Sequence, residues 1–335
     1  MTDLSLPGGY APAENRRGSL RLEPSLIKGL SQRSLPQSLF YIAVQWSAIV
    51  ASIAVARRFD SDIVLLLCLF VIATRQHALA VLVHEGCHFN LCDSKFLNDL
   101  LTNVFAAFPL SMSVKRYRNS HFAHHRLLNQ DDDPDIVENT PPTSSIKLAG
   151  LLLMDLCFLS LPKNAKRARK FGVFAIFTEK GEGWTVERRL YIAFISTVIV
   201  AATAFGVWKQ VGLYWLIPEF SMLQVLTRLR GYADHGGRLD EVEELRKTRT
   251  VEANVLERFV FAPGSVNRHL EHHLYPSVPF YNLDGLHAAL RAKALDGAIP
   301  PPSQGYLRLP LLKRSAFGEI FLKKNATPPS AEEPN

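Results

Sequence analysis

Three short histidine-rich motifs in this chain have a spacing suited to binding metal ions. On a helix, positions i, i+3 and i+4 lie within an arc of about 100°, so each motif presents its imidazoles on one face. About 0.01 H-x-x-H-H motifs are expected by chance in a chain with this histidine content, and two occur here. The three motifs are His84-Glu-Gly-Cys-His88, His121-Phe-Ala-His124-His125 and His269-Leu-Glu-His272-His273.

The number of these histidines indicates two metal ions rather than one. Neutral imidazole is a good ligand for iron, zinc, copper and nickel, and one such ion takes about four to six ligands. The motifs supply eight imidazoles. Burying eight imidazoles near a membrane surface is costly unless they bind something. The sequence therefore predicts a site for two metal ions.

The motifs lie beside segments that are long and apolar enough to cross a bilayer. A helix needs about 20 mostly apolar residues to cross about 30 Å of hydrocarbon. The first motif follows the second of these segments, the second motif lies in the long middle segment, and the third motif follows the fourth. We predict four membrane spans in two helical hairpins, at about 39–56, 63–83, 190–208 and 210–228.

The basic residues indicate which side of the membrane each segment faces, because Lys and Arg are enriched on the cytoplasmic side. They gather before the first span, in the middle segment and after the fourth span, whereas the two hairpin turns contain few. Both termini and all three motifs are therefore predicted to be cytoplasmic. A short apolar segment at about 148–161, followed by a basic cluster at 163–170, is predicted to lie as a helix in the membrane interface. The expected fold is an all-α integral membrane protein with a cytoplasmic helical cap that holds the metal site.

The composition excludes several other classes of protein. A hydrophobic fraction of 47% excludes overall disorder, and four cysteines without a C-x-x-C pair exclude a disulfide framework. The membrane topology explains the net charge of +7, and the basic residues form no nucleic-acid-binding motif. We divide the chain into a largely disordered cytoplasmic N-terminal segment (1–33), a membrane domain (34–290) and a C-terminal cytoplasmic extension with a disordered tail (291–335). The oligomeric state is not indicated.

The three motifs on two transmembrane hairpins resemble the membrane fatty acid desaturase/hydroxylase superfamily. The pattern is similar to that of its bacterial acyl-lipid desaturases in two stretches, Asn267-Arg-His-Leu-Glu-His-His-Leu-Tyr-Pro-Ser-Val-Pro-Phe-Tyr281 and Asp131-Asp-Asp-Pro-Asp135. The likeness extends over about residues 35–290.

The resemblance implies a non-haem di-iron centre held almost entirely by histidines, with a ninth histidine between the fourth span and the third motif. Only His235 fits that place. Some relatives carry an Asn four residues before this histidine, where this chain has Gly231, so one coordination position stays unassigned. The implied metal ligands are His84, His88, His121, His124, His125, His235, His269, His272 and His273.

The resemblance also implies an O2-dependent reaction that introduces a double bond into a fatty acyl chain, in a lipid or a carrier-bound form. Hydroxylation of a lipid, a carotenoid or a smaller amphiphile is the alternative, because the same ligands serve both outcomes. Electrons must come from a separate ferredoxin or b-type cytochrome, since the chain contains no His-Pro-Gly-Gly haem signature, iron–sulfur cysteine pattern or G-x-G-x-x-G loop. A basic cytoplasmic face would steer an acidic donor.

Two other classes of protein compete with this interpretation. The sequence His84-Glu85-x-x-His88 matches the H-E-x-x-H motif of zinc metalloproteases, in which Glu85 would be the general base. A metalloprotease would leave both H-x-x-H-H motifs unused. Measuring the metal content distinguishes the two functions, because a desaturase would bind two irons and a protease one zinc. The other class is a metal-binding protein without turnover, which an assay with reductant, O2 and lipid extract would identify.

Three smaller features carry expectations of their own. We expect His77 to be a polar residue inside the helix bundle and His287 to be a surface or packing residue, with neither binding metal. Metal-bound imidazoles usually donate their second N–H to a carboxylate or carbonyl. One of the four aspartates after the second motif is therefore a candidate for orienting a ligand; they are Asp131, Asp132, Asp133 and Asp135.

Overall fold

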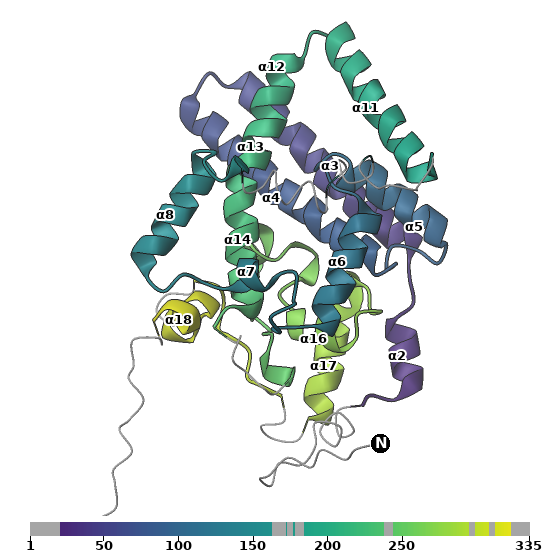
Figure 1. Cartoon of the computed structure of the whole chain (residues 1–335), viewed down its shortest axis with the longest axis vertical. Helices are drawn as coiled ribbons and strands as arrows, with labels where there is room; N and C mark the ends of the chain where they lie inside the picture. Colours follow the sequence, from purple (N-terminus) through teal and green to yellow (C-terminus); the bar gives the residue numbers. More distant parts are fainter. Residues whose placement is uncertain are drawn as a thin grey trace, which may run out of the picture.

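The computed structural model describes residues 21–162, 172, 177, 184–237, 244–294, 299–307 and 312–322. These residues form helices joined by loops (Figure 1), and the β-structure among them is limited to three isolated bridges. The predicted all-α class is confirmed. Three predictions fall on residues that lie outside the described ones: disorder before residue 21, disorder after residue 322, and the basic cluster at 163–170.

Helix α2 (Pro24–Leu30) lies in the N-terminal segment predicted to be largely disordered, and for these residues that prediction was wrong. Proline in its first turn has a φ angle that suits a helix. Ile27 and Leu30 pack against an apolar cluster that includes Leu286 of α17 (Leu283–Lys293). Tertiary burial therefore stabilises a helix that is too short to be stable alone.

Helices α3 (Leu35–Arg58) and α4 (Asp62–Cys87) form a hairpin that contains the first two predicted spans. The hydroxyl oxygens of Ser34 and Ser61 cap their first turns by accepting backbone N–H groups. Among the described residues, these two helices alone are long and apolar enough to cross a membrane.

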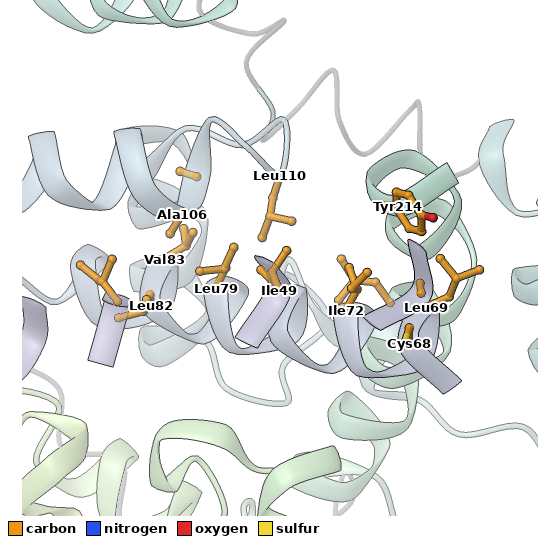
Figure 2. Packing of buried hydrophobic residues seen from close by; sticks show 14 of the residues in the cluster. Ile49, Cys68, Leu69, Ile72, Leu79, Leu82, Val83, Ala106, Leu110 and Tyr214 are labelled. Atoms are coloured by element: carbon orange, nitrogen blue, oxygen red, sulfur yellow. The ribbon is translucent and has the colours of Figure 1, made fainter. Parts of the chain in front are cut away.

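The main apolar core forms where α3 packs on α4, and Figure 2 shows it from close by. Ile49 of α3 and Ile72 and Leu79 of α4 are almost fully buried there. The exposure of α4 changes along its length: its first turns display apolar side chains such as Ile63, whereas residues 71–87 are buried or half-buried. The second half of α4 is therefore enclosed by the rest of the protein.

The segments predicted as the third and fourth spans are helical, and the fourth is interrupted. Helix α11 (Val186–Ala204) covers most of 190–208. Residues 210–228 are divided between helices that follow one another along one line in Figure 1. The interruption is at Ser221, where φ is −124° and ψ is −88°. Pro218 acts on the preceding turn instead, because its missing N–H would have bonded the carbonyl of Tyr214 in the π-helical segment. The pieces are α12 (Trp208–Val211), the π-helical η2 (Gly212–Leu216), α13 (Ile217–Phe220) and α14 (Met222–His235).

Helix α8 (Ser145–Leu156) occupies most of the segment predicted to lie in the membrane interface. Ile146 and Leu153 are exposed on it, at 83% and 60%. Asp155 is fully buried and accepts two hydrogen bonds, at 2.6 and 2.9 Å, from the guanidinium of Arg228 on α14. The one carboxylate in this apolar segment thus ties α8 to α14.

Shorter helices carry the histidine motifs and enclose the end of α4. Helix α6 (Val114–Arg126) carries the second motif, α16 (His269–Leu274) carries the third, and α14 ends at His235. The remaining described helices are α5 (Lys95–Thr102), η1 (Asn103–Ala107), α7 (Ile136–Asn139), η3 (Glu244–Arg246), α15 (Val255–Val260), η4 (Pro263–Ser265), η5 (Phe280–Asn282), η6 (Leu312–Arg314) and α18 (Ala316–Phe321).

Candidate metal centre

Five imidazoles from all three motifs form the first of two groups, and their ligand atoms all lie within 4.8 Å of one another. His84 lies in the last turn of α4 and His88 is its C-cap residue. The Nε2 atoms of His121 and His125 are 2.9 Å apart, and those of His125 and His272 are 3.2 Å apart. The ends of α4, α6 and α16 therefore meet at this point.

The second group contains His124, His235 and His273, again within 4.8 Å of one another. His269 adjoins it: its Nε2 atom lies 2.9 Å from Nε2 of His235 and 3.1 Å from Nε2 of His273. The histidine at the end of α14, singled out by its position between the fourth span and the third motif, thus lies among those of the second and third motifs.

The two groups are direct neighbours. The rings of His125 and His273 stack with their centroids 4.2 Å apart. His124 and His125 belong to different groups because successive residues on a helix point about 100° apart. The structure therefore brings together all nine histidines predicted as ligands, in two groups of ligand atoms that could each hold a metal ion, with His269 beside the second group.

The protonation and the unpaired nitrogen atoms of these histidines suit transition-metal ions. Burial, reinforced by neighbouring imidazoles, lowers the pKa of His121 and His272 well below the ordinary value, so both rings are neutral and offer a lone pair. The buried Nε2 atoms of His84 and His88 have no hydrogen-bond partner among the described residues. Buried polar atoms are nearly always paired, so these two unpaired buried nitrogen atoms indicate a site for a bound ligand. Their lone pairs suit the metals that imidazole prefers, which are iron, zinc, copper and nickel.

Of the four aspartates after the second motif, Asp133 is hydrogen-bonded to a histidine of the cluster. Nδ1 of His124 lies 2.9 and 3.1 Å from its two carboxylate oxygens, which also accept the backbone N–H groups of Asn129 and Asp135. Burial raises the pKa of Asp133, but these hydrogen bonds outweigh it and lower the pKa overall. An ionised carboxylate at Nδ1 keeps the imidazole proton there and leaves Nε2 of His124 available to a metal.

Glu85 has a similar position beside the first motif. Its Oε1 atom lies 3.2 Å from Nδ1 of His84, while Oε2 accepts the backbone N–H of Phe280 at 3.0 Å and the amide of Asn90 at 3.3 Å. The protein thus engages both oxygens of a carboxylate that is 2% exposed. This geometry suits a residue that orients His84, and it counts against the metalloprotease alternative, in which Glu85 must activate water.

Arg118 of α6 caps the C-terminal end of α4, which carries the first motif. Its guanidinium donates to the carbonyl oxygens of Gly86 and Cys87 at 2.9 and 2.7 Å and pairs with Asp99 at 2.6 Å. The last carbonyls of a helix lack partners within it and carry a partial negative charge. Arg118 therefore fixes the end of α4 against α6, three residues before His121.

Arg249 caps α14 in the same way. Its guanidinium donates to the carbonyl oxygens of Tyr232, Ala233 and Gly236, at 3.2, 2.6 and 2.7 Å, and these residues flank His235. Sequence reasoning missed both arginines, because a helix-capping guanidinium that comes from another segment has no spacing pattern of its own.

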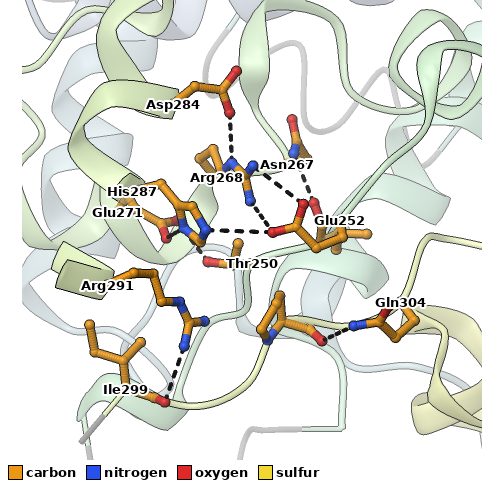
Figure 3. Close-up of polar contacts among 12 residues, drawn as sticks. Thr250, Glu252, Asn267, Arg268, Glu271, Asp284, His287, Arg291, Ile299 and Gln304 are labelled. Carbon is orange, nitrogen blue, oxygen red and sulfur yellow. Dashed lines mark hydrogen bonds and ion pairs between the residues drawn. The ribbon is translucent and has the colours of Figure 1, made fainter. Parts of the chain in front are cut away.

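A network of polar side chains contacts the helix that carries the third motif, through Glu271 (Figure 3). Glu271, inside that motif, is buried, accepts the hydroxyl of Thr250 at 2.7 Å and pairs with Nδ1 of His287 at 2.6 Å. His287, expected to be a surface or packing residue, is a half-buried partner of α16 and lies outside both histidine groups. The network also includes Glu252, Arg268 and Asp284.

Gly231 lies one turn before His235, and its missing side chain allows Asn139 to pack closely against α14. A Cβ atom there would lie 3.3 Å from Oδ1 of Asn139 on α7, a residue that is 5% exposed. The carboxamide of Asn139 thus occupies space that a larger side chain at Gly231 would need.

Comparison with known proteins agrees with this arrangement. A family model described as fatty acid desaturase matches residues 63–302, a range that contains all nine histidines. The chain is 25% identical over 308 residues to dihydrorhizobitoxine desaturase of Bradyrhizobium elkanii, covering 87% of this chain and 81% of that protein. It is 24% identical over 233 residues to Delta(8)-fatty-acid desaturase of Euglena gracilis, covering 60% and 55%. It is 26% identical over 299 residues to the probable fatty acid desaturase DES1 of Sorghum bicolor, covering 82% and 76%. Because the family model spans well over half of its length, this chain belongs to the fatty acid desaturase family.

Proposed function

We propose that this protein introduces a double bond into a fatty acyl chain, carried by a lipid or by another acyl carrier, in an O2-dependent reaction at a di-iron centre. The convergence of nine histidines, six of them buried and three half-buried, into two adjacent groups is the observation that carries the proposal. The desaturase names of the three relatives support the reaction class. In this proposal the first group holds one iron, and the second group together with His269 holds the other.

Two irons in this cluster would supply the O2 chemistry needed to break unactivated C–H bonds. In the overall reaction one hydrogen leaves each of two neighbouring methylene carbons, O2 is reduced to two waters, and two electrons and two protons enter from outside. A ferredoxin or a b-type cytochrome would supply the electrons. The protein's own part is to orient imidazoles through Asp133 and Glu85, to fix helix ends through Arg118 and Arg249, and to exclude water by burial.

We also propose that the protein crosses the membrane four times, with the metal centre and both termini in the cytoplasm. The length and composition of α3 and α4 support the first hairpin. Helices α11 and α12–α14 would form the second, with α8 lying in the interface. The distribution of Lys and Arg along the sequence supports the orientation.

A second candidate is desaturation of a substrate that is not a fatty acid. The name of the Bradyrhizobium relative, which refers to dihydrorhizobitoxine, favours it. Hydroxylation of a lipid, a carotenoid or a smaller amphiphile would use the same cluster. All three reactions differ in their products.

Product analysis is therefore the decisive experiment. The protein is expressed in a host of known lipid composition, and lipids and small metabolites are compared by mass spectrometry with those of a host that carries the His272→Ala variant. New double bonds in acyl chains support the proposal, a new double bond in a small metabolite supports the second candidate, and added oxygen supports hydroxylation. Products that are equally abundant with His272→Ala contradict the assigned ligand set.

Metal analysis of the purified protein tests the centre separately from turnover. We expect two irons per chain in the native protein and in Asp132→Asn, because Asp132 is exposed and belongs to neither group. We expect less iron in His124→Ala with normal membrane insertion. One zinc per chain in the native protein would contradict the proposal.

A further inference from the structure

Helix α15 presents an exposed apolar face that the proposed chemistry does not explain. Val255, Leu256 and Phe259 are 86%, 71% and 37% exposed. Their positions i, i+1 and i+4 fall within an arc of about 100°, so they form one face. Contiguous exposed apolar surface usually marks a site of contact with another molecule or with a membrane.

Contacts with α4 and α3 place α15 at a defined level along the first hairpin. The guanidinium of Arg75 donates to the carbonyl oxygen of Phe259 at 2.6 Å and lies 3.9 Å from the centroid of its ring. Nδ1 of His77 lies 3.4 Å from the carbonyl oxygen of Val260. Arg75 also donates to Oε1 of Gln45 on α3 at 2.9 Å. The end of α15 is therefore level with the middle of both helices.

That level lies within the predicted membrane spans. Arg75 is 13 residues after Asp62, the first residue of α4, which corresponds to about 20 Å at 1.5 Å per residue. A hydrocarbon layer of about 30 Å that begins near Asp62 would extend past Arg75. Gln45 on α3 also lies within the predicted hydrocarbon layer. It is six residues after the start of the predicted span at 39–56, which corresponds to a depth of about 9 Å.

Several polar groups of α15 have protein partners, as a segment at this depth requires, and Arg258 pairs with Asp284 at 3.0 Å. Arg75 and His77 serve its last carbonyl oxygens. Glu257 is buried, forms a capping box with Asn254 and accepts the backbone N–H of Tyr306 at 2.7 Å. On its apolar face, Val255 and Leu256 are the most exposed residues, and Phe259 is partly covered by Arg75.

We propose that α15 is embedded in the bilayer, with the face formed by Val255, Leu256 and Phe259 in contact with lipid acyl chains below the headgroups. This inference rests on the proposed crossing of the membrane by α3 and α4. It attaches the third histidine motif to the lipid layer, because α15 ends nine residues before His269.

Depth-dependent quenching of a fluorophore tests the inference on the full chain in proteoliposomes. Cys157 is the exposed one of four free cysteines, so Cys157→Ser provides a background in which added surface cysteines can be labelled. Three probe sites are compared: Leu256→Cys on α15, Val50→Cys on the exposed side of α3, and Ala292→Cys on the exposed surface of α17, next to α2 and far from α11 in Figure 1.

We expect lipids brominated near the headgroup end of the acyl chain to quench the Leu256→Cys probe at least about twofold more than the Ala292→Cys probe, since an embedded helix lies about 5–10 Å into the headgroup and acyl boundary. The Val50→Cys probe should respond most to bromines near the bilayer centre. Quenching at Val50→Cys without quenching at Leu256→Cys would overturn the inference and leave the membrane crossing intact. Absence of quenching at both sites would overturn the crossing itself.

Discussion

Replacement of Asp133 by asparagine should weaken the binding of one iron and leave the other in place. The Asp133 carboxylate contacts Nδ1 of His124 through both oxygens and also accepts the backbone N–H groups of Asn129 and Asp135. His124 belongs to the second group of histidines alone. The effect of the substitution should therefore be confined to the iron proposed for that group.

The size of the effect follows from these hydrogen bonds. In the asparagine variant one oxygen becomes an NH2 group, so whichever way the amide turns, one backbone N–H faces a donor, which costs about 1–3 kcal/mol. His124 also exchanges an ionised acceptor for a neutral one, whose hydrogen bond is roughly half as strong. Loss of such orienting contacts typically weakens metal binding by about 10–100-fold, equivalent to about 1.4–2.7 kcal/mol.

Iron titration of the purified variant under anaerobic conditions measures this effect. We expect one tight site that is unchanged and one site weakened by about 10–100-fold. Asp132→Asn is the matched control, because this neighbouring aspartate is exposed and should keep both sites unchanged. Two unchanged sites in Asp133→Asn, or equal losses in both variants, would refute the assignment of Asp133 and the grouping of His124.

Arg118→Met should lower the thermal midpoint and the iron content together, since two carbonyl oxygens at the end of α4 lose a charged donor, at a cost of about 1–3 kcal/mol; an unchanged midpoint would contradict its capping role. Gly86→Ala should be destabilising by about 1–3 kcal/mol, because a Cβ there would lie 2.0 Å from Oγ1 of Thr102. Gly150→Ala, on a helix with nothing within 4 Å, should instead raise the free energy of unfolding by about 1 kcal/mol; equal effects at the two glycines would contradict this packing. Removal of iron with a chelator should lower the thermal midpoint, because a metal in thousandfold excess over its Kd stabilises the folded state by about 4 kcal/mol; identical midpoints with and without iron would argue against a metal bound to the folded state.

The all-helical class and the first hairpin could be predicted from local pattern. The uncharged apolar run at 39–56 corresponds closely to α3, and the apolar run at 63–83, interrupted by Arg75, Gln76 and His77, corresponds to α4. A helix that meets lipid or a protein core along its whole length needs few polar positions. The fourth predicted segment shows where this reasoning stops. Its composition is apolar, but a hydropathy pattern does not record the break in the helix at Ser221.

The sequence by itself determined that the second and third motifs present their imidazoles within an arc of about 100° on one helix, because that property depends only on the period of the helix. His88 of the first motif lies instead at the C-cap of α4. The sequence also pointed to the aspartates after the second motif as candidates for an orienting carboxylate, of which Asp133 contacts His124, but it did not point to Glu85 in that role. Tertiary structure alone decided which imidazoles share a group: His124 and His125 are adjacent in the chain and lie in different groups, and His272 and His273 are divided in the same way. The physical reason is that adjacent side chains on a helix diverge, so their partners are set by which helix ends meet, and distant residues such as Arg118 and Arg249 hold those ends in place.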